Sequence, residues 1–376
     1  MAKKIKWYSI LEVLFGIILS IADPITDILT LMEFYRADHK TWFGVGLTFI
    51  VLPSLFFLVV NYVANKFTSG RDDEEGQSKA CNFTHVLVLG CNPLLPAWLK
   101  LRTLYCYLKK LLKLRQGNNT NQTDEDLDVL LELSKLGVLG EAALESAPQF
   151  IIQLYAIVVQ QESVSIIQIV SLPVSFVSLA WASTVADEFI YSVLREITNF
   201  SVKEKVLHFV THLFILSSRL FAVALFTVSY KWWVTSVLIF HCTVMTILDV
   251  WVWTRQGSVH DSAIISVIYF CIHWLRDDLS AIHRDEPDEH KHLSRMQLVS
   301  NVLFVIENII MILLFYFSHF PHTWYSLPVT ICVCFFAVLG AVMRLTRSYF
   351  LYKDSDGRAN DTDQVQQQSH SNPVEV

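Results

Sequence analysis

Long apolar runs separated by short polar segments dominate the chain. Eight of these runs have about the 20 residues that a helix needs to cross a bilayer. They cover residues 9–31, 42–64, 136–160, 164–186, 205–229, 232–254, 297–318 and 323–346. Two further apolar stretches, 85–99 and 259–275, are too short for a full crossing, and we expect re-entrant or interfacial inserts there. The pattern predicts an all-α polytopic membrane protein.

The same order of segments occurs twice along the chain. Each half has two spans, a short insert and two more spans, which indicates two structural repeats without repetition of individual residues. The first repeat covers 1–190 and includes a basic amphipathic helix at 100–115 that we expect to lie on anionic headgroups. The second repeat covers 191–350. The polar tail 351–376 has the composition of a disordered segment.

Composition agrees with a membrane protein and excludes several other classes. Hydrophobic residues make up 53% of the chain and charged residues only 17%. The seven cysteines are scattered, so neither a disulfide framework nor a zinc spacing emerges. No nucleotide-binding glycine motif is present, and we expect no cofactor, no metal and no nucleic acid partner. The His-rich segment 283–292 is more typical of a solvated loop than of a metal site.

Lysine and arginine are distributed unevenly between the two predicted sides of the membrane. With both termini cytoplasmic, the inner segments hold 24 of the 29 basic residues and the outer loops hold 3. Basic residues concentrate in the cytoplasmic loops of membrane proteins. We therefore expect a multi-pass protein with both termini in the cytoplasm.

The third predicted span carries a row of polar side chains inside its apolar run. Four polar residues recur at every fourth position: Glu141, Glu145, Gln149 and Gln153. Residues with this spacing share one face of a helix. A charge near the bilayer centre costs about 2.5 to 3.5 kcal/mol on insertion scales, so this face must meet protein, water or a polar passenger. Pro148 lies within the row and should kink or open the helix locally.

Ionisable side chains interrupt other spans as well. They are Asp23, Asp27, Asp187, Arg219 and Glu307. Buried ion pairs that fix helix register would explain any one of them. Together with Glu141 and Glu145, however, they set six acidic positions against one arginine, and this excess favours a polar path across the membrane. The row of hydroxyls at Ser171, Ser175 and Ser178 is more typical of helix-packing contacts.

In the order of its landmarks the chain resembles the XK-related family. The landmarks are Asp23-Pro-Ile-Thr-Asp27, Trp42, Glu141, Glu145-Ser-Ala-Pro-Gln149, Trp181 followed by an acidic residue, Ser218-Arg219-Leu-Phe-Ala-Val-Ala-Leu-Phe and Glu307. The resemblance implies phospholipid scrambling that exposes phosphatidylserine at the plasma membrane, in members that caspase cleavage activates during apoptosis. It also implies a lipid path with Trp42 near the outer opening. The path residues would be Asp23, Asp27, Trp42, Glu141, Glu145, Gln149, Asp187, Arg219 and Glu307.

Two other functions stay open at this point. A secondary transporter would also have repeats, broken helices and midplane charges, but it needs a sealed solute cavity and a coupling ion. A non-catalytic membrane anchor for a partner protein is the third hypothesis, as the family's founding member is for the Kell protein. None of the three requires covalent chemistry, and a single-span partner could assist delivery to the cell surface.

The tail offers two sites for partners. Asp356 precedes Gly357 in an accessible polar segment, so we predict caspase cleavage after Asp356 and removal of an inhibitory tail, although Lys353 departs from the preferred pattern. Val374-Glu375-Val376 could add as a strand to a PDZ-type groove. An ordinary solubilising tail is the alternative to both.

Overall fold

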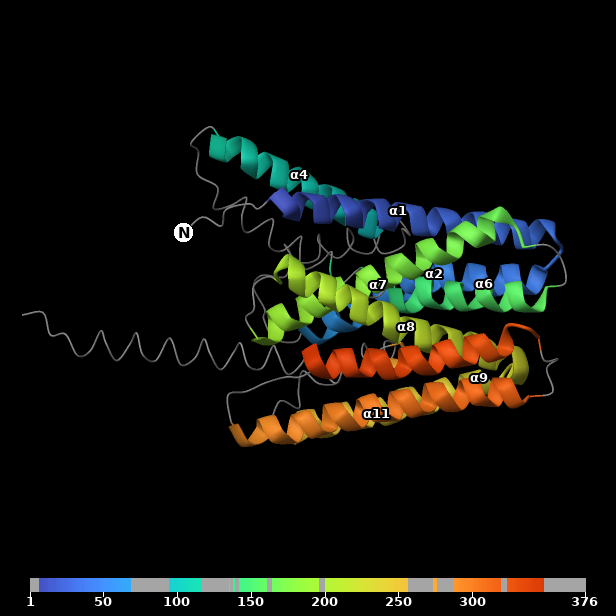
Figure 1. Ribbon diagram of the computed structural model, residues 1–376. Helices are drawn as coiled ribbons and strands as arrows, with labels where there is room; N and C mark the ends of the chain where they lie inside the picture. Colours follow the sequence, from blue (N-terminus) through green and yellow to red (C-terminus); the bar gives the residue numbers. More distant parts are fainter. Residues whose placement is uncertain are drawn as a thin grey trace, which may run out of the picture.

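The computed structural model in Figure 1 shows a bundle of long helices. It describes residues 7–68, 95–115, 135, 138, 142–160, 164–195, 200–255, 273–275, 287–318 and 323–347. In these ranges every regular element is helical, so the all-α fold class is confirmed.

Each of the eight predicted spans falls on helix. The helices are α1 (Trp7–Arg36), α2 (Lys40–Thr68), η1 (Ala142–Ser146) with α6 (Ala147–Val159), α7 (Ile166–Arg195), α8 (Val202–Tyr230), α9 (Trp233–Arg255), α11 (Pro287–Phe317) and the last helix, Ser326–Arg347. Six of the described helices are long and apolar enough to cross a membrane. In α2 and α9 the apolar parts are shorter, Lys40–Pro53 and Trp233–Leu248, so the count of eight spans stays a prediction.

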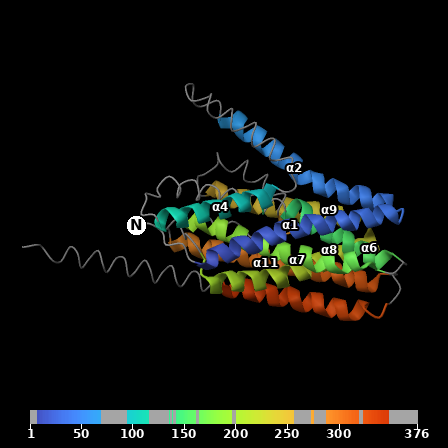
Figure 2. The same cartoon turned by 90° about the horizontal axis from the view of Figure 1, so that it is seen from above.

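Helix α8 lies at the centre of the bundle. It packs against α6, α7, α9 and α11, while α1 packs against α2, α4 and α7 (Figure 1). Helix α2 begins against the bundle and leans away from it toward its own end (Figure 2). Large apolar side chains such as Ile18, Phe240 and Phe335 are exposed on the outer faces, as expected for a surface that lipid covers.

Two apolar clusters hold α8 in place. One joins it to η1, α6 and α7 through small, aliphatic and aromatic side chains, including Ala147, Leu220 and Phe150. The other joins it to α11 and the last helix, with Ile312 and Val333 in its centre. Since small residues let helix backbones approach closely, the alanines on these faces explain the tight packing.

Local sequence sets where α8 begins. Ser201 accepts a hydrogen bond from the backbone N–H of Glu204, and the Glu204 carboxylate accepts one from the backbone N–H of Ser201. This reciprocal arrangement satisfies two backbone donors that the first turn of a helix leaves unpaired. A cluster of ion pairs nearby ties α8 to its neighbours, because Lys205 lies 2.5 Å from Glu12 of α1 and 3.0 Å from Glu188 of α7.

Helix α4 (Leu95–Arg115) starts earlier than the predicted basic helix. The first predicted insert, 85–99, therefore ends inside α4, and the rest of it lies outside the described residues. Lys100 points inward, with 9% of its surface exposed, and Nζ donates to the Gly16 carbonyl and to Ser20 Oγ of α1. The opposite side of α4 is apolar and exposed at Trp98 and Tyr105. One of its basic residues thus faces protein.

Only the end of the second predicted insert, 259–275, is among the described residues. His273 and Leu275 are each 1% exposed, and Leu275 packs in the cluster around Ala147 and Phe150. This end of the segment lies in the protein interior. The repeat boundaries at 190 and 350 stay predictions, and the tail 351–376 lies outside the described residues.

We expect Gly340→Ala to destabilise the fold, because a Cβ at Gly340 would lie 2.9 Å from Ile215 Cγ1 and 3.2 Å from the Ile215 backbone nitrogen. Overpacking of this kind typically costs about 1–3 kcal/mol. Thermal unfolding of the purified chain in detergent measures the effect. Gly44→Ala is the matched control, since no described atom lies within 4 Å of a Cβ there. Equal unfolding temperatures for both variants would contradict the close approach of the last helix to α8.

Candidate functional site

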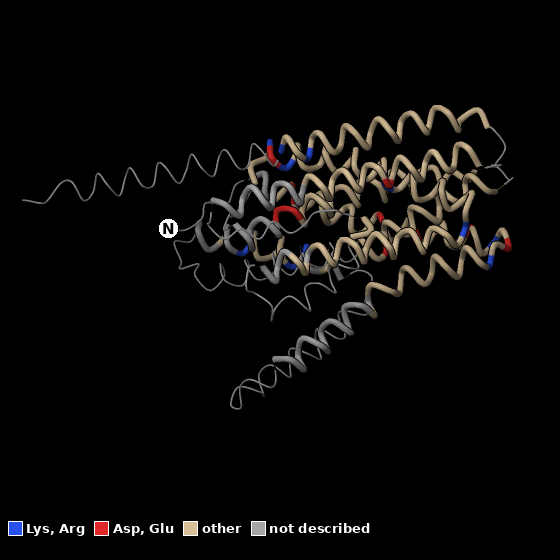
Figure 3. Tube along the Cα trace, turned by 90° about the horizontal axis from the view of Figure 1, so that it is seen from below, with Lys and Arg blue, Asp and Glu red and all other residues tan. Residues whose placement is uncertain are grey.

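Polar side chains gather at three places inside the bundle. Figure 3 shows acidic and basic residues at the ends of the described helices and at a few positions midway along them. We name the three groups by their main residues. The aspartate cluster holds Asp23 and Asp27, the arginine cluster holds Arg219 and Glu307, and the histidine cluster holds Asp187, His208 and His212.

The aspartate cluster lies between α1, η1, α6 and α7. Asp23 and Asp27 are one helical turn apart on α1 and are 2% and 1% exposed. Ser146 Oγ donates to Asp23 Oδ2 at 2.8 Å, and Gln153 Nε2 donates to Asp27 Oδ1 at 2.9 Å. The hydroxyl of Ser175 also donates to Asp27 Oδ1, at 3.2 Å. The two carboxylates therefore meet donors from three different elements.

The polar row of the third span faces α1 and α2, and its Gln153 is the residue that donates to Asp27 of α1. Glu145 and Gln149 are 3% and 0% exposed, and Gln149 Nε2 donates to the Gly46 carbonyl of α2 at 2.6 Å. Glu141, which also belongs to the predicted path, lies outside the described residues. The three members of the row that the structure describes, Glu145, Gln149 and Gln153, are thus buried against protein, as their cost in lipid requires.

Pro148 opens the helix as predicted. The five residues before α6 form a π-helical turn, η1, and Pro148 stands in the first turn of α6, where a missing backbone donor is tolerated. A π-turn inserts an extra residue into the helix and re-aims the side chains around it. Here Glu145 and Ser146 lie on that turn, and Ser146 points at Asp23.

Part of each carboxylate is left for another donor. Among the described residues, no donor meets hydrogen-bonding geometry with Oδ1 of Asp23 or Oδ2 of Asp27, and both atoms are buried. Such buried acceptors are uncommon in proteins and call for an explanation. Lys100 of α4 also interacts electrostatically with Asp23. Its ammonium group donates to Ser20, which lies about one turn before Asp23 on α1.

Lys100 corrects the charge balance drawn from the sequence. That balance counted Arg219 as the one cation for six acidic positions, because Lys100 and Arg347 were placed in surface segments. Both are buried, at 9% and 2% exposure, and both lie near path residues. The negative excess inside the bundle is smaller than predicted. In the sequence, Lys100 has the same amphipathic surroundings as the basic residues that were expected to contact lipid headgroups, so nothing there indicated that it faces protein.

The hydroxyl row on α7 was predicted to make helix-packing contacts. Ser171 and Ser175 instead donate to Asp27 Oδ1, at 3.4 Å and 3.2 Å. Their fourfold spacing was visible in the sequence, but only the position of α1 reveals which atom they reach.

Trp42 lies in the first turn of α2. Its ring centroid is 5.6 Å from that of Phe34, 4.2 Å from that of His39 and 6.2 Å from that of Tyr155. These rings cover the end of the bundle at which α1 ends. None of these three ring contacts involves Asp23 or Asp27. Through Tyr155, however, Trp42 packs against α6, the helix that also carries Gln153.

The arginine cluster brings together two predicted residues from α8 and α11. Arg219 Nη1 lies 3.2 Å from Glu307 Oε1, and it donates to Asn308 Oδ1 at 3.0 Å. Arg219 Nε donates to the Trp274 carbonyl at 2.8 Å, while His241 Nδ1 lies 2.5 Å from Glu307 Oε2. Arg219 is fully buried, whereas 19% of the Glu307 side chain is exposed. The pair is thus open on its carboxylate side.

The histidine cluster contains the remaining predicted residue, Asp187. Its Oδ2 lies 2.7 Å from His208 Nδ1, 2.8 Å from His212 Nε2 and 3.1 Å from Arg347 Nη1. Neither histidine was among the predicted site residues, although their spacing of four on one helix was a readable signal. Each predicted residue that the structure describes, apart from Trp42, therefore lies in or beside a polar cluster, and all of these except Glu307 are buried.

These features define a polytopic α-helical membrane protein with ionisable side chains buried between its helices. The sequence model of one family, described as XK-related protein, matches residues 11–352. XK-related protein 8 of Tetraodon nigroviridis is 23% identical over 262 residues, a match that covers 68% of this chain and 62% of that protein. The matched part thus spans less than two thirds of that relative. The chain belongs to the XK-related family, which confirms the resemblance drawn from its landmarks.

Replacing Arg219 should damage folding more than it changes chemistry. Arg219→Gln leaves Glu307 without its guanidinium, and breaking a buried ion pair typically costs about 3–5 kcal/mol. We expect a large loss of correctly folded protein, measured by size-exclusion chromatography and thermal unfolding. Glu307→Gln added to Arg219→Gln should recover part of the loss, since it removes the unpaired charge.

The exposed pair Lys40–Asp38, at 3.0 Å, provides the control for this experiment. Lys40→Gln should leave the unfolding temperature nearly unchanged, because surface ion pairs contribute little. If Arg219→Gln behaves like Lys40→Gln, the arginine cluster does not stabilise the fold.

Proposed function

We propose that this protein is an energy-independent phospholipid scramblase. A phospholipid flips slowly because its polar headgroup must cross hydrocarbon. A protein accelerates the exchange by offering polar partners along the path while the acyl chains stay in lipid. The observation that carries the proposal is the aspartate cluster, a set of buried acceptors and donors shared by α1, η1, α6 and α7. Membership of the XK-related family supports it.

The chemistry of the cluster suits the headgroups of phosphatidylserine and phosphatidylethanolamine. Their ammonium groups need acceptors, and no described donor meets hydrogen-bonding geometry with Asp23 Oδ1 or Asp27 Oδ2. Their phosphates need donors, which the side chains of Gln153 and Ser175 carry nearby. Hydrogen bonds to charged groups contribute about 1.5–3 kcal/mol each.

Burial of the cluster points to a closed, resting conformation. Asp23 and Asp27 are 2% and 1% exposed, so a headgroup reaches them only after α1 moves relative to α6 or α7. Gly46 and Gln149 lie on the far side of this interface, where α2 meets α6. We propose that the intact chain holds this closed form and that cleavage of its tail favours opening.

The setting of this activity follows from the same reasoning. Membership of the XK-related family supports the plasma membrane as the location. The distribution of lysine and arginine supports cytoplasmic positions for both termini. The partners would be phosphatidylserine and other phospholipids, a caspase and a single-span protein that delivers the chain to the surface. A PDZ-type domain at Val374-Glu375-Val376 would be a further partner.

Reconstitution in liposomes separates scrambling from secondary transport. Fluorescent lipids in both leaflets are followed with the full chain and with a tail-truncated chain. Exchange in both directions without an ion gradient supports the scramblase. Dependence on a gradient would favour a transporter, which couples solute to an ion. A chain that moves no lipid in either form would favour the membrane anchor.

Asp27→Asn should lower scrambling about tenfold or more while the chain still folds. Asparagine keeps an acceptor for Gln153 and Ser175 but removes the charge that a headgroup ammonium would meet. A loss of about 1.4 kcal/mol in the path corresponds to a factor of ten. The rate of lipid exchange per folded molecule is the measurement, made in the tail-truncated form.

Asp38→Asn is the matched control, since Asp38 is an exposed aspartate at the turn between α1 and α2. Asparagine tolerates the positive φ of 60° at that position. Equal exchange rates for Asp27→Asn, Asp38→Asn and the unaltered chain would remove the aspartate cluster from the path. Glu141→Ala and Glu145→Ala extend the test to the polar row of the third span.

Cleavage after Asp356 should activate the protein. Incubation with an executioner caspase is expected to release a peptide that begins at Gly357, identified by sequencing, and to raise lipid exchange in the same liposomes. Asp356→Ala should block both effects, while Asp361→Ala should block neither. An Asp356→Ala chain that is cut and activated normally would place the cleavage elsewhere.

A further inference from the structure

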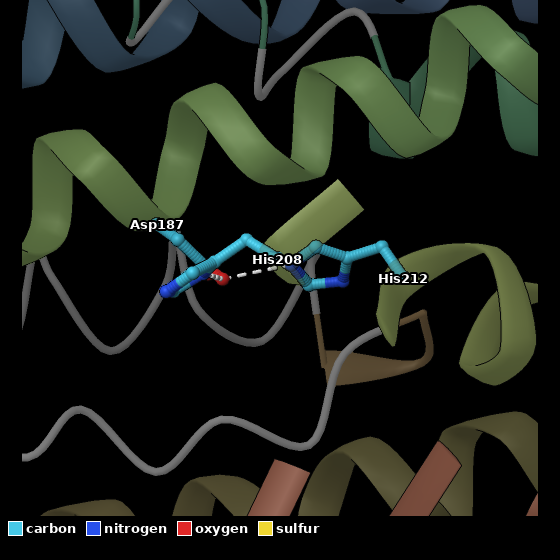
Figure 4. A group of neighbouring side chains, drawn as sticks. All are labelled: Asp187, His208 and His212. Atoms are coloured by element: carbon cyan, nitrogen blue, oxygen red, sulfur yellow. Dashed lines mark hydrogen bonds and ion pairs between the residues drawn. The ribbon is translucent and has the colours of Figure 1, made fainter. Parts of the chain in front are cut away.

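We propose that Asp187, His208 and His212 form a binding site for a divalent transition metal ion, with Zn²⁺ as the ion that suits them best. The site lies where α7 faces the first turns of α8 (Figure 4). Asp187 also belongs to the expected lipid path, but the metal site does not depend on the proposed scrambling, because it follows from the ligand atoms alone.

The geometry converges on one point. His208 and His212 are four residues apart, so they stand one above the other on the same face of α8. This spacing is the one by which helices present two imidazoles to zinc. Asp187 reaches the same point from α7, and the three ligand atoms lie within 4.8 Å of one another. Figure 4 shows the three side chains directed toward each other.

The ligand set matches zinc chemistry. Two imidazole nitrogens and one carboxylate oxygen are a common three-ligand set for Zn²⁺, which leaves a fourth position for water or another ligand. At zinc–ligand distances of about 2.0–2.1 Å in a tetrahedron, neighbouring ligand atoms lie about 3.3 Å apart. The contacts of 2.7 and 2.8 Å from Asp187 to the histidines would lengthen by only about half an ångström.

The site is enclosed by protein. All three side chains are 1–2% exposed, and the ring of Phe200 lies against that of His208 with their centroids 4.5 Å apart. Low solvent access strengthens the attraction between a cation and the Asp187 carboxylate. The neighbouring Glu188 interacts with Lys205 and Lys135, so its charge is directed away from Asp187.

Arg347 competes for the same place. Its Nη1 lies 3.1 Å from Asp187 Oδ2 and 3.1 Å from His208 Nδ1. The 2.7 Å contact between His208 Nδ1 and Asp187 Oδ2 requires a proton on Nδ1. A protonated Nδ1 cannot accept a hydrogen bond from Arg347, so His208 Nδ1 satisfies only one of these two partners at a time. A metal ion and a guanidinium repel one another at such distances. Metal binding would therefore displace Arg347 and release the end of the last helix from α7 and α8.

This competition gives the site a distinctive test. Zn²⁺ is titrated into the full chain in detergent against a chromophoric chelator, in a background with His283, His290 and His292 replaced by Ala. We expect one zinc ion per chain. His208→Ala and His212→Ala should each weaken binding about tenfold or more, whereas Arg347→Gln should strengthen it about tenfold. His39→Ala, which alters a histidine at the turn between α1 and α2, should change nothing.

Co²⁺ provides a readout that needs no substitution in the site. One Co²⁺ bound by two imidazoles and a carboxylate in tetrahedral geometry gives strong visible absorption, which Zn²⁺ should abolish by displacement. Absence of stoichiometric zinc uptake, a purely octahedral cobalt spectrum, or equal zinc affinity in the histidine variants would overturn the proposal. Weaker zinc binding in Arg347→Gln would overturn the competition with Arg347.

Discussion

Burial of carboxylates between apolar helices is the constraint on which the rest of this structure depends. A buried charge or polar group is costly unless donors surround it. Asp27 meets this demand with Gln153 from α6 and Ser175 from α7, so three helices are fixed relative to one another by one side chain. Arg219 does the same for α8 and α11 through Glu307 and Asn308. Apolar packing fills the space that these contacts define.

Sequence patterns predicted the helices and their polar faces well. Runs of apolar residues placed every span on a helix, and Pro148 correctly marked a local opening, which is the π-turn η1. Arg219 and Glu307, both recognised in the sequence as ionisable residues within spans, form an ion pair. These successes share a physical basis, because helix period and membrane thickness act along a single segment.

The sequence could not show which helix faces contact one another. Lys100 was expected among lipid headgroups, yet it reaches Ser20 of α1, and the serines of α7 were expected to serve packing, yet they donate to Asp27. Each of these contacts joins residues about 80 to 150 positions apart. The spacing of polar residues along a helix defines a face, but the partner of that face depends on how all the helices pack.

The three clusters also bear on how the proposed lipid path could open. Arg219 and His208 lie on the same helix, eleven residues apart, which corresponds to about 16 Å along its axis. The aspartate cluster lies on the other side of α6 and α7, which are two of the helices that α8 packs against. A rigid shift of α8 would therefore strain the arginine and histidine clusters together and loosen the wall behind Asp27. A long helix moves as a unit. The histidine cluster near the start of α8 and the arginine cluster in its middle would therefore both resist a movement that separates α6 and α7 from Asp27.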